Sequence, residues 1–245
     1  MARPFFSVLM PVWDRPHLVG QAIQSIVDQS FEDWELVVVD DFSEDNTLEV
    51  VSRYKFDDKV RIIELEKHKG LVEALTIGNV ACQGKVIVKQ DSDDLSFPNR
   101  LQRIYDYFKK NPKTDFFYHG IYQVWETEES TDIRRAYIPA LPIERKRILK
   151  EQYIPGAFAY TKEFIKRLPY RELHCSEDWM LILDAYLSGA KIGYLNEGLY
   201  DCMLRPDSNS LMHENTGHYE EDEKTIREVL RDTYGIINFN YAKRK

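Results

Sequence analysis

Cysteine is scarce in this 245-residue chain, which contains only Cys82, Cys175 and Cys202. Three widely separated cysteines fit neither a disulfide framework nor a zinc site, so a reducing, cytoplasmic setting is the simplest interpretation. No apolar run approaches the length needed to span a bilayer, and the first segment, MARPFFSVLMPVW, is too short for a signal peptide. The sequence therefore predicts neither a disulfide-stapled scaffold nor an integral membrane protein.

A surplus of positive charge is also missing. The net charge is -8, which argues against a nucleic-acid-binding protein, because such proteins present a basic face. Internal repeats and low-complexity segments are absent as well. Hydrophobic residues make up 43% of the chain, enough for the core of one large domain or two small ones.

Apolar runs alternate with amphipathic stretches through the first 110 residues. Strands are predicted over residues 5–10, 34–39, 60–65 and 85–90, the first ending at Pro11. Helices are predicted over residues 16–30, 43–54, 70–82 and 99–110. This alternation is typical of an α/β fold in which helices cover both faces of a parallel sheet.

The alternation stops after residue 110. Residues 115–126 and 133–138 are predicted to form an antiparallel hairpin with the polar tip TEESTD. The segment IPGAFAY is predicted to be a glycine-containing loop that enters a short strand, and residues 161–168 a short helix. Then follow a helix over residues 179–187, short strands over 192–195 and 199–204, a polar loop over 205–215 and a charged helix over 220–234. This half is therefore expected to be mixed.

Acidic residues cluster where two of the predicted strands end. Asp91, Asp93 and Asp94 follow the fourth strand, and Asp40 and Asp41 follow the second. Three carboxylates this close favour a bound divalent cation, although a solvated turn is an alternative for each cluster. Because the carboxyl ends of parallel strands share one edge of a sheet, two such clusters indicate a ligand site.

Several segments, in order, resemble the family 2 glycosyltransferases. They are the first strand with PVWD, then SIVDQSFEDWELVVVDDFSEDNT, GKVIVKQDSDDLSFPNRL and HCSEDWMLILDAYLSGAKIGYL. The resemblance implies a single GT-A domain, with a mostly parallel Rossmann-like sheet flanked by helices and a smaller mixed region on the acceptor side. Residues 1–110 would bind the nucleotide sugar, residues 111–213 would bind the acceptor and carry catalysis, and residues 214–245 would form a C-terminal helix and tail.

The resemblance also implies an activity and roles for named residues. The reaction would be an inverting transfer, dependent on Mn²⁺ or Mg²⁺, from a nucleotide-diphosphate sugar to a glycan or other hydroxyl acceptor. A UDP-sugar is favoured because a carboxylate suits the N–H of uracil. Asp178 would be the base, with Glu177 as its rival, although acidic residues are also common in the first turn of any helix.

The implied binding residues fall into two groups. The nucleotide sugar would contact Pro11, Trp13, Asp14, Asp40, Asp41, Gly70, Asp91, Ser92, Asp93, Arg205 and Ser210. The metal would be held by Asp93, Asp94 and Asp91, with His213 as a further candidate.

The chain departs from the family pattern in places. Trp13-Asp14 stands where Tyr-Asn is common, and no Arg-Trp pair of the processive members occurs, which favours single transfers over polymer synthesis. The family implies glycan or polysaccharide assembly and allows a peripheral position on the inner face of a membrane. Two alternatives stay open: an inert glycan-binding domain and a sugar-1-phosphate nucleotidyltransferase. The second is disfavoured because PVWDRPH lacks the glycines that would hold a triphosphate.

Overall fold

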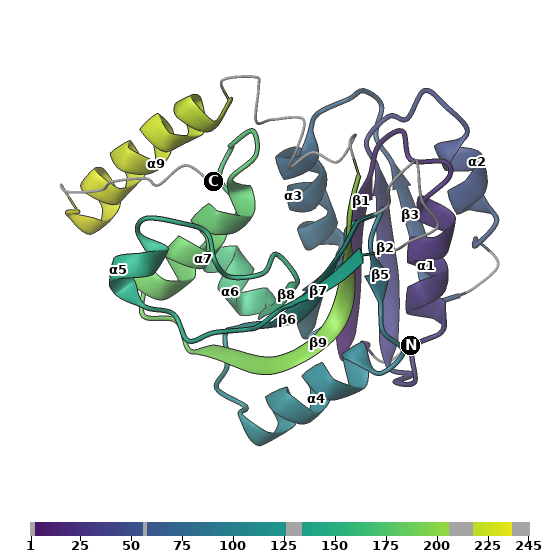
Figure 1. Ribbon diagram of the computed structural model, residues 1–245. Coiled ribbons are helices and arrows are strands. Elements are labelled where there is room, and N and C mark those ends of the chain that lie inside the picture. The colour runs from purple at the N-terminus through teal and green to yellow at the C-terminus, as the bar shows by residue number, and fades with distance from the viewer. Residues whose placement is uncertain (1–2, 56–57, 126–133, 206–217, 237–245) are drawn as a thin grey trace.

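The first half of the chain forms a parallel sheet. The computed structural model describes residues 3–55, 58–125, 134–205 and 218–236. Four parallel strands lie in the order β3-β2-β1-β4 (Figure 1). They are β1 (Phe6–Val12), β2 (Trp34–Asp40), β3 (Val60–Glu64) and β4 (Val86–Lys89). The predicted strands of this half are confirmed, and so is their parallel arrangement.

Helices cover both faces of this sheet because the strand side chains alternate in direction. They are α1 (Val19–Val27), α2 (Thr47–Ser52), α3 (Leu71–Ala81) and α4 (Arg100–Lys110). Leu9 and Ile87 lie in the core that includes α3, whereas their neighbours Val8 and Val88 lie in the core that includes α1 and α4. The near-continuous apolar runs of β1, β2 and β4 follow from this double burial.

The second half adds strands of mixed direction to the same sheet. The order continues from β4 through β8, β6 and β9 to β5, while β7 pairs with β6. These strands are β5 (Leu95–Ser96), β6 (Phe116–Trp125), β7 (Arg134–Ile138), β8 (Phe158–Thr161) and β9 (Ile192–Leu204). The predicted hairpin is confirmed as β6 and β7, and its predicted tip lies outside the described residues.

Within the described part of the mixed half, the helices are α5 (Arg145–Ile148), α6 (Lys162–Arg167), α7 (Glu177–Leu187) and α9 (His218–Tyr234). In Figure 1, α9 lies on the outer side of α7. Ile226 and Leu230 of α9 pack into the same core as Trp179 and Leu183 of α7. Among the residues described, no helix is both long and apolar enough to cross a membrane.

Two strand predictions were wrong in their extent. β1 continues through Pro11 to Val12. A proline is tolerated there because β4 pairs only with residues 6–9 of β1, so the missing N–H removes no bond between the two strands. Residues 192–204 form one strand rather than two, because irregularities in the register beside His119 and Gly120 let β9 follow β6 without a break.

Candidate active site

The loops that follow β1 and β2 are tied together by hydrogen bonds. Asp40 is buried at the end of β2, and its Oδ1 accepts a hydrogen bond from Ser43 Oγ at 2.6 Å. Ser43 Oγ in turn accepts from the N–H of Asp14 at 3.1 Å, and Asp14 Oδ1 accepts from the N–H of Glu44 at 3.0 Å. Burial raises the pKa of Asp40 despite these bonds. Two of the predicted donor-site residues, Asp14 and Asp40, are therefore linked through Ser43.

Asp41 fixes the start of α3. Its Oδ1 accepts from the N–H of Lys69 at 2.8 Å and its Oδ2 from the N–H of Gly70 at 2.7 Å. Gly70 has a φ of 88°, and a Cβ there would meet no atom within 4 Å, so the backbone conformation rather than space requires glycine. His68 Nδ1 lies 3.0 Å from Asp41 Oδ2. Asp41 thus organises the loop in addition to the nucleobase contact expected of it.

An exposed aromatic pair stands beside these loops. The rings of Trp13 and His68 lie 4.3 Å apart between centroids, and Trp13 is 48% exposed. Pro11, the other residue predicted from this segment, is buried within β1. Trp13 therefore offers a flat, accessible surface next to Asp14, whereas the side chain of Pro11 is buried in β1 and offers none.

A buried ammonium group connects β4 to α7. Lys89 Nζ lies 2.8 Å from Asp91 Oδ1 and 3.0 Å from Asp178 Oδ2, and its side chain is 4% exposed. Burial alone would lower the pKa of Lys89, but the carboxylates of Asp178 and Asp91 outweigh it and raise that pKa well above its ordinary value. One permanently charged group therefore joins a predicted donor-site aspartate to the predicted base.

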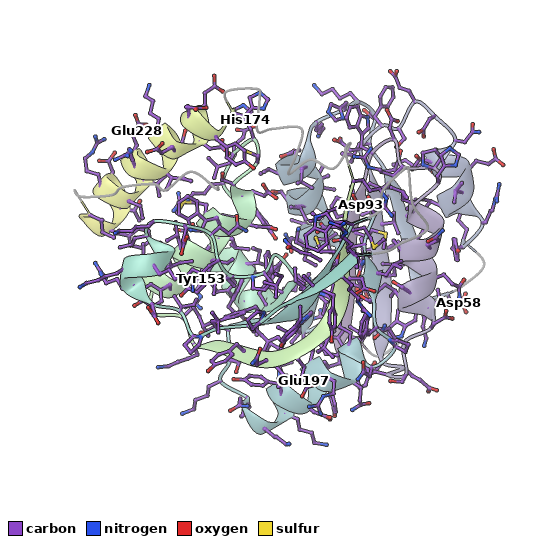
Figure 2. All side chains as sticks on the ribbon, in the orientation of Figure 1. Asp58, Asp93, Tyr153, His174, Glu197 and Glu228 are labelled. Atoms are coloured by element: carbon purple, nitrogen blue, oxygen red, sulfur yellow. The ribbon has the colours of Figure 1, made fainter. Side chains whose placement is uncertain are left out.

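The turn after β4 carries the remaining aspartates. Burial and the charge of Asp91 raise the pKa of Asp93, and Figure 2 shows Asp93 near the upper ends of the central strands. Asp94 is 4% exposed and its Oδ1 accepts from the N–H of Met203 at 2.7 Å. Ser92 is buried in the same turn. Asp91 and Asp93 are thus the more accessible carboxylates, and Asp94 anchors the turn to β9.

This turn stands on a buried polar network. Gln90 Nε2 donates to the carbonyls of Asp91 and Asp94, at 3.0 and 2.9 Å. Arg100 donates to Gln90 Oε1 at 3.0 Å and to the Lys89 carbonyl at 3.0 Å. Tyr200 Oη accepts from the N–H of Asp91 at 3.0 Å. A satisfied network of this kind holds one conformation of the turn.

Glu177 and Asp178 occupy the first turn of α7. Burial raises the pKa of Glu177 to about 8, and the charge of Asp178 acts in the same direction. Glu177 is therefore mainly protonated at neutral pH, whereas Asp178 is paired with the ammonium of Lys89. Burial is thus the main reason that Glu177 favours its protonated form, whereas Asp178 has the Lys89 ammonium as its ion-pair partner.

Glycine at position 156 leaves room for the Asp178 carboxylate. A Cβ at Gly156 would lie 2.9 Å from Asp178 Oδ2, which is closer than real Cβ contacts. Gly156 lies just before β8 in the segment IPGAFAY, which enters this strand, and β8 pairs with β4. The backbone of this loop therefore lies directly against the predicted base.

The structure connects the predicted site residues in separate small groups. Asp91 and Asp178 share Lys89, and Arg205 Nη1 donates to the carbonyl of Asp93 at 3.1 Å. Ser210 and His213 lie outside the described residues. Among the residues that are described, no three His, Cys, Asp or Glu side chains form a group that holds a metal by itself.

Lys89 and Gly156 were not predicted from the sequence. A lysine at the end of the apolar run VIVK was the available signal for Lys89, because a charge in a doubly covered strand needs a buried partner. Gly156 was predicted only as the glycine of a loop, with no role at the site.

A curled mixed sheet, covered by helices and carrying carboxylates at its parallel strand ends, defines a GT-A fold. Residues 1–349 of S. aureus TarS, solved with UDP-GlcNAc, share it at a TM-score of 0.74 and 20% identity, over 93% of this chain and 66% of that one. The mannosyltransferase PcManGT from Pyrobaculum calidifontis, solved with GDP-Man and Mn²⁺, aligns at a TM-score of 0.67 and 16% identity, over 92% and 65%.

The chain belongs to glycosyl transferase family 2, whose pattern matches residues 7–169. Glycosyltransferase GlyG of Streptococcus pneumoniae serotype 4 is 24% identical over 84% of this chain and 72% of its own. Bifunctional glycosyltransferase pgtA of Dictyostelium discoideum is 36% identical over 38% of this chain and 13% of its own. For five relatives that are 29–36% identical, the aligned part is only 13–40% of the relative's own length.

Proposed function

We propose that this chain transfers a sugar from a UDP-sugar to a hydroxyl acceptor, with inversion at the anomeric carbon and Asp178 as the base. The observation that carries the proposal is the shared ammonium of Lys89, which holds Asp178 within reach of Asp91 at the strand ends. Asp91 and Asp178 come from the two halves of the chain, and in this proposal donor and acceptor chemistry would meet where these two residues share Lys89. Residues 1–110 would bind the donor and residues 111–213 the acceptor.

The donor site would use the strand-end loops. The nucleobase would stack on Trp13, because the exposed ring of Trp13 lies beside Asp14 and His68. Asp40 and Asp41 supply carboxylate oxygens toward the base or ribose, and each oxygen has more than one acceptor position. Uracil suits them because it carries an N–H. The TarS structure with UDP-GlcNAc supports a nucleotide sugar as the class of donor.

A divalent cation would bind at Asp91 and Asp93. The donor set fits, because hard cations take carboxylate oxygens and Mg²⁺ is usually held by one or two carboxylates together with substrate phosphates. The raised pKa of Asp93, caused by burial and by Asp91, also favours a cation there. The Mn²⁺ complex of PcManGT supports the same choice. When bound, the cation would neutralise charge on the departing nucleotide.

Asp178 would accept the proton of the acceptor hydroxyl. A hydroxyl is a poor nucleophile at neutral pH, and a positioned carboxylate that takes its proton accelerates attack by about 10²–10⁴-fold. Glu177 is the weaker candidate because it is mainly protonated at neutral pH. Its neutral state also limits repulsion beside Asp178.

Release of UDP from UDP-sugars and of GDP from GDP-sugars, measured over a panel of both with and without Mn²⁺, tests the proposed function. We expect turnover with a UDP-sugar, dependence on Mn²⁺ and a product of inverted anomeric configuration by NMR. Asp178→Asn should reduce turnover by about 100-fold or more and leave UDP affinity unchanged, because it keeps the shape and removes the basicity. Asp106→Asn is the control, since Asp106 lies on α4. A retained configuration would refute the base assignment, and the absence of turnover with every donor would refute the activity.

A further inference from the structure

One carboxylate of α9 accepts hydrogen bonds from three consecutive backbone N–H groups. Asp222 of α9 accepts from the N–H of His174 at 2.9 Å, of Cys175 at 2.9 Å and of Ser176 at 3.0 Å. The Asp222 side chain is buried, at 1% exposure. Burial disfavours its charge, but the hydrogen bonds from His174 and Cys175 outweigh burial and lower its pKa. The carboxylate is therefore ionised and fully engaged.

The three N–H groups belong to the segment that leads directly into Glu177 and Asp178. The first N–H groups of a helix lack partners within the helix, and a side chain at the N-cap usually supplies one. Ser176 is the N-cap of α7, and its side chain makes no such bond. Asp222, on another helix, accepts from the N–H of this N-cap residue and of the two residues before it, and its negative charge also suits the positive end of the α7 dipole.

The helix that carries Asp222 is itself fixed to α7. Tyr234 Oη at the other end of α9 donates to Asp184 Oδ1 at 2.6 Å, and Arg171 Nε donates to Asp184 Oδ2 at 2.9 Å. Figure 2 shows His174 beside the start of α9. Contacts at the start and at the end of α9 therefore hold the first turn of α7 in one orientation.

We propose that Asp222 is a positioning residue, which acts through the backbone of residues 174–176 to hold the Asp178 carboxylate in its productive direction. This rests on the proposed function, in which Asp178 is the base. A displacement of about 1 Å at a reacting group costs about 100-fold in rate. In this proposal α9 belongs to the catalytic apparatus through the contact of Asp222 with the segment before α7.

Asp222→Asn and Asp222→Ala, with Glu228→Gln as a matched control, test the proposal. Asn replaces one acceptor oxygen with a donor that faces N–H groups, whereas Glu228 is exposed on the same helix. We expect both Asp222 variants to lose about 10- to 100-fold in kcat, with the KM for donor and the Kd for UDP within twofold of wild type. The control should keep wild-type kinetics.

A double-mutant cycle distinguishes positioning from general destabilisation. In the Asp178→Asn background, Asp222→Ala should cause little further loss of kcat, because residues that act as a unit are not additive. Additive losses, a parallel loss of UDP affinity or an unchanged kcat in the folded variants would overturn the proposal.

Hydrogen exchange separates this test from that of the proposed function. The amides of residues 174–176 should lose protection in Asp222→Ala and keep it in Glu228→Gln. Unchanged protection would refute the contact itself, whether or not a donor is found. Another outcome is that wild type turns over no donor while Asp222→Ala still loses protection as expected. In that case the proposed function and the catalytic role of Asp222 are both refuted, and the structural contact is confirmed.

Discussion

The Lys89 ammonium lies 3.0 Å from Asp178 Oδ2, in a position where the lysine side chain is 4% exposed. A buried charge is tolerated only when it is paired, and here the pair joins the end of β4 to the first turn of α7. The contact therefore has two consequences. It compensates the charges of Asp178 and Asp91, and it fixes the distance between the two halves of the site.

Lys89→Met should destabilise the protein by about 3–5 kcal/mol, because it leaves two carboxylates without their buried cation. Urea unfolding at neutral pH measures this loss. Lys85→Met, at an exposed position just before β4, is the control and should stay close to wild type. Adding Asp178→Asn to Lys89→Met should recover part of the loss, since it removes one of the uncompensated charges. If the double variant is as unstable as the sum of the singles, the pair is not a coupled unit.

Asp93→Ala should abolish the effect of Mn²⁺ on UDP binding while the fold survives. The hydrogen bond from Arg205 goes to the Asp93 carbonyl, so the substitution leaves it in place. Saturation with a ligand at 100 times its Kd stabilises a protein by about 2.7 kcal/mol, so Mn²⁺ with UDP should raise the Tm of wild type and not of the variant. Asp33→Ala, an exposed position before β2, is the control. An Asp93→Ala protein that keeps the Mn²⁺-dependent affinity would place the metal elsewhere.

The acidic residues at the strand ends could be predicted because the rule behind them is local. A parallel sheet brings the carboxyl ends of β2 and β4 to one edge, and both runs were readable from their apolar pattern. The Lys89–Asp178 pair could not be predicted, since the two residues are 89 positions apart and meet only after β8 has paired with β4. From the sequence, Asp222 is only one charged residue of a polar helix. Its contact with the segment before α7 depends on the packing of α9 on α7.

The same limit explains the errors in strand extent. Pro11 ends a strand by local rules, yet it is tolerated in β1 because its neighbour β4 no longer pairs at that point. Asn196, Glu197 and Gly198 look like a break between two strands, but the irregular pairing of β6 with β9 accommodates them. In both places the neighbouring strand decides the outcome, and a single segment does not contain that information.

His119 should make the protein less stable in mild acid. Its Nε2 accepts from Arg100 Nε at 3.0 Å, so the buried ring is neutral, and burial followed by the charge of Arg100 lowers its pKa to about 3. An unfolded histidine titrates near 6.5, so between these values the unfolded state binds more protons and stability falls as pH falls. From neutrality to pH 5 this amounts to about 2 kcal/mol.

His119→Gln keeps an acceptor for Arg100 and removes the titration, so its loss of stability between pH 7 and 5 should be smaller by about 2 kcal/mol. Urea unfolding at pH 7, 6 and 5 provides the comparison. His17→Gln, at an exposed position, should keep the pH dependence of wild type. The same slope in His119→Gln as in wild type would show that the buried ring takes up a proton without cost.

Gly156→Ala should impair turnover far more than stability. The new methyl group would lie 2.9 Å from Asp178 Oδ2, and relief requires either the loop or the carboxylate to move. Because Lys89 holds Asp178 Oδ2 at 3.0 Å, movement of the carboxylate disturbs the ion pair and the direction of the proposed base. We expect about a 10- to 100-fold loss of kcat with UDP affinity retained. Gly20→Ala is the control: its Cβ lies 3.4 Å from Val50 in a helix, where alanine is favourable. A Gly156→Ala enzyme with normal kcat would mean that the loop yields and that Asp178 does not depend on it.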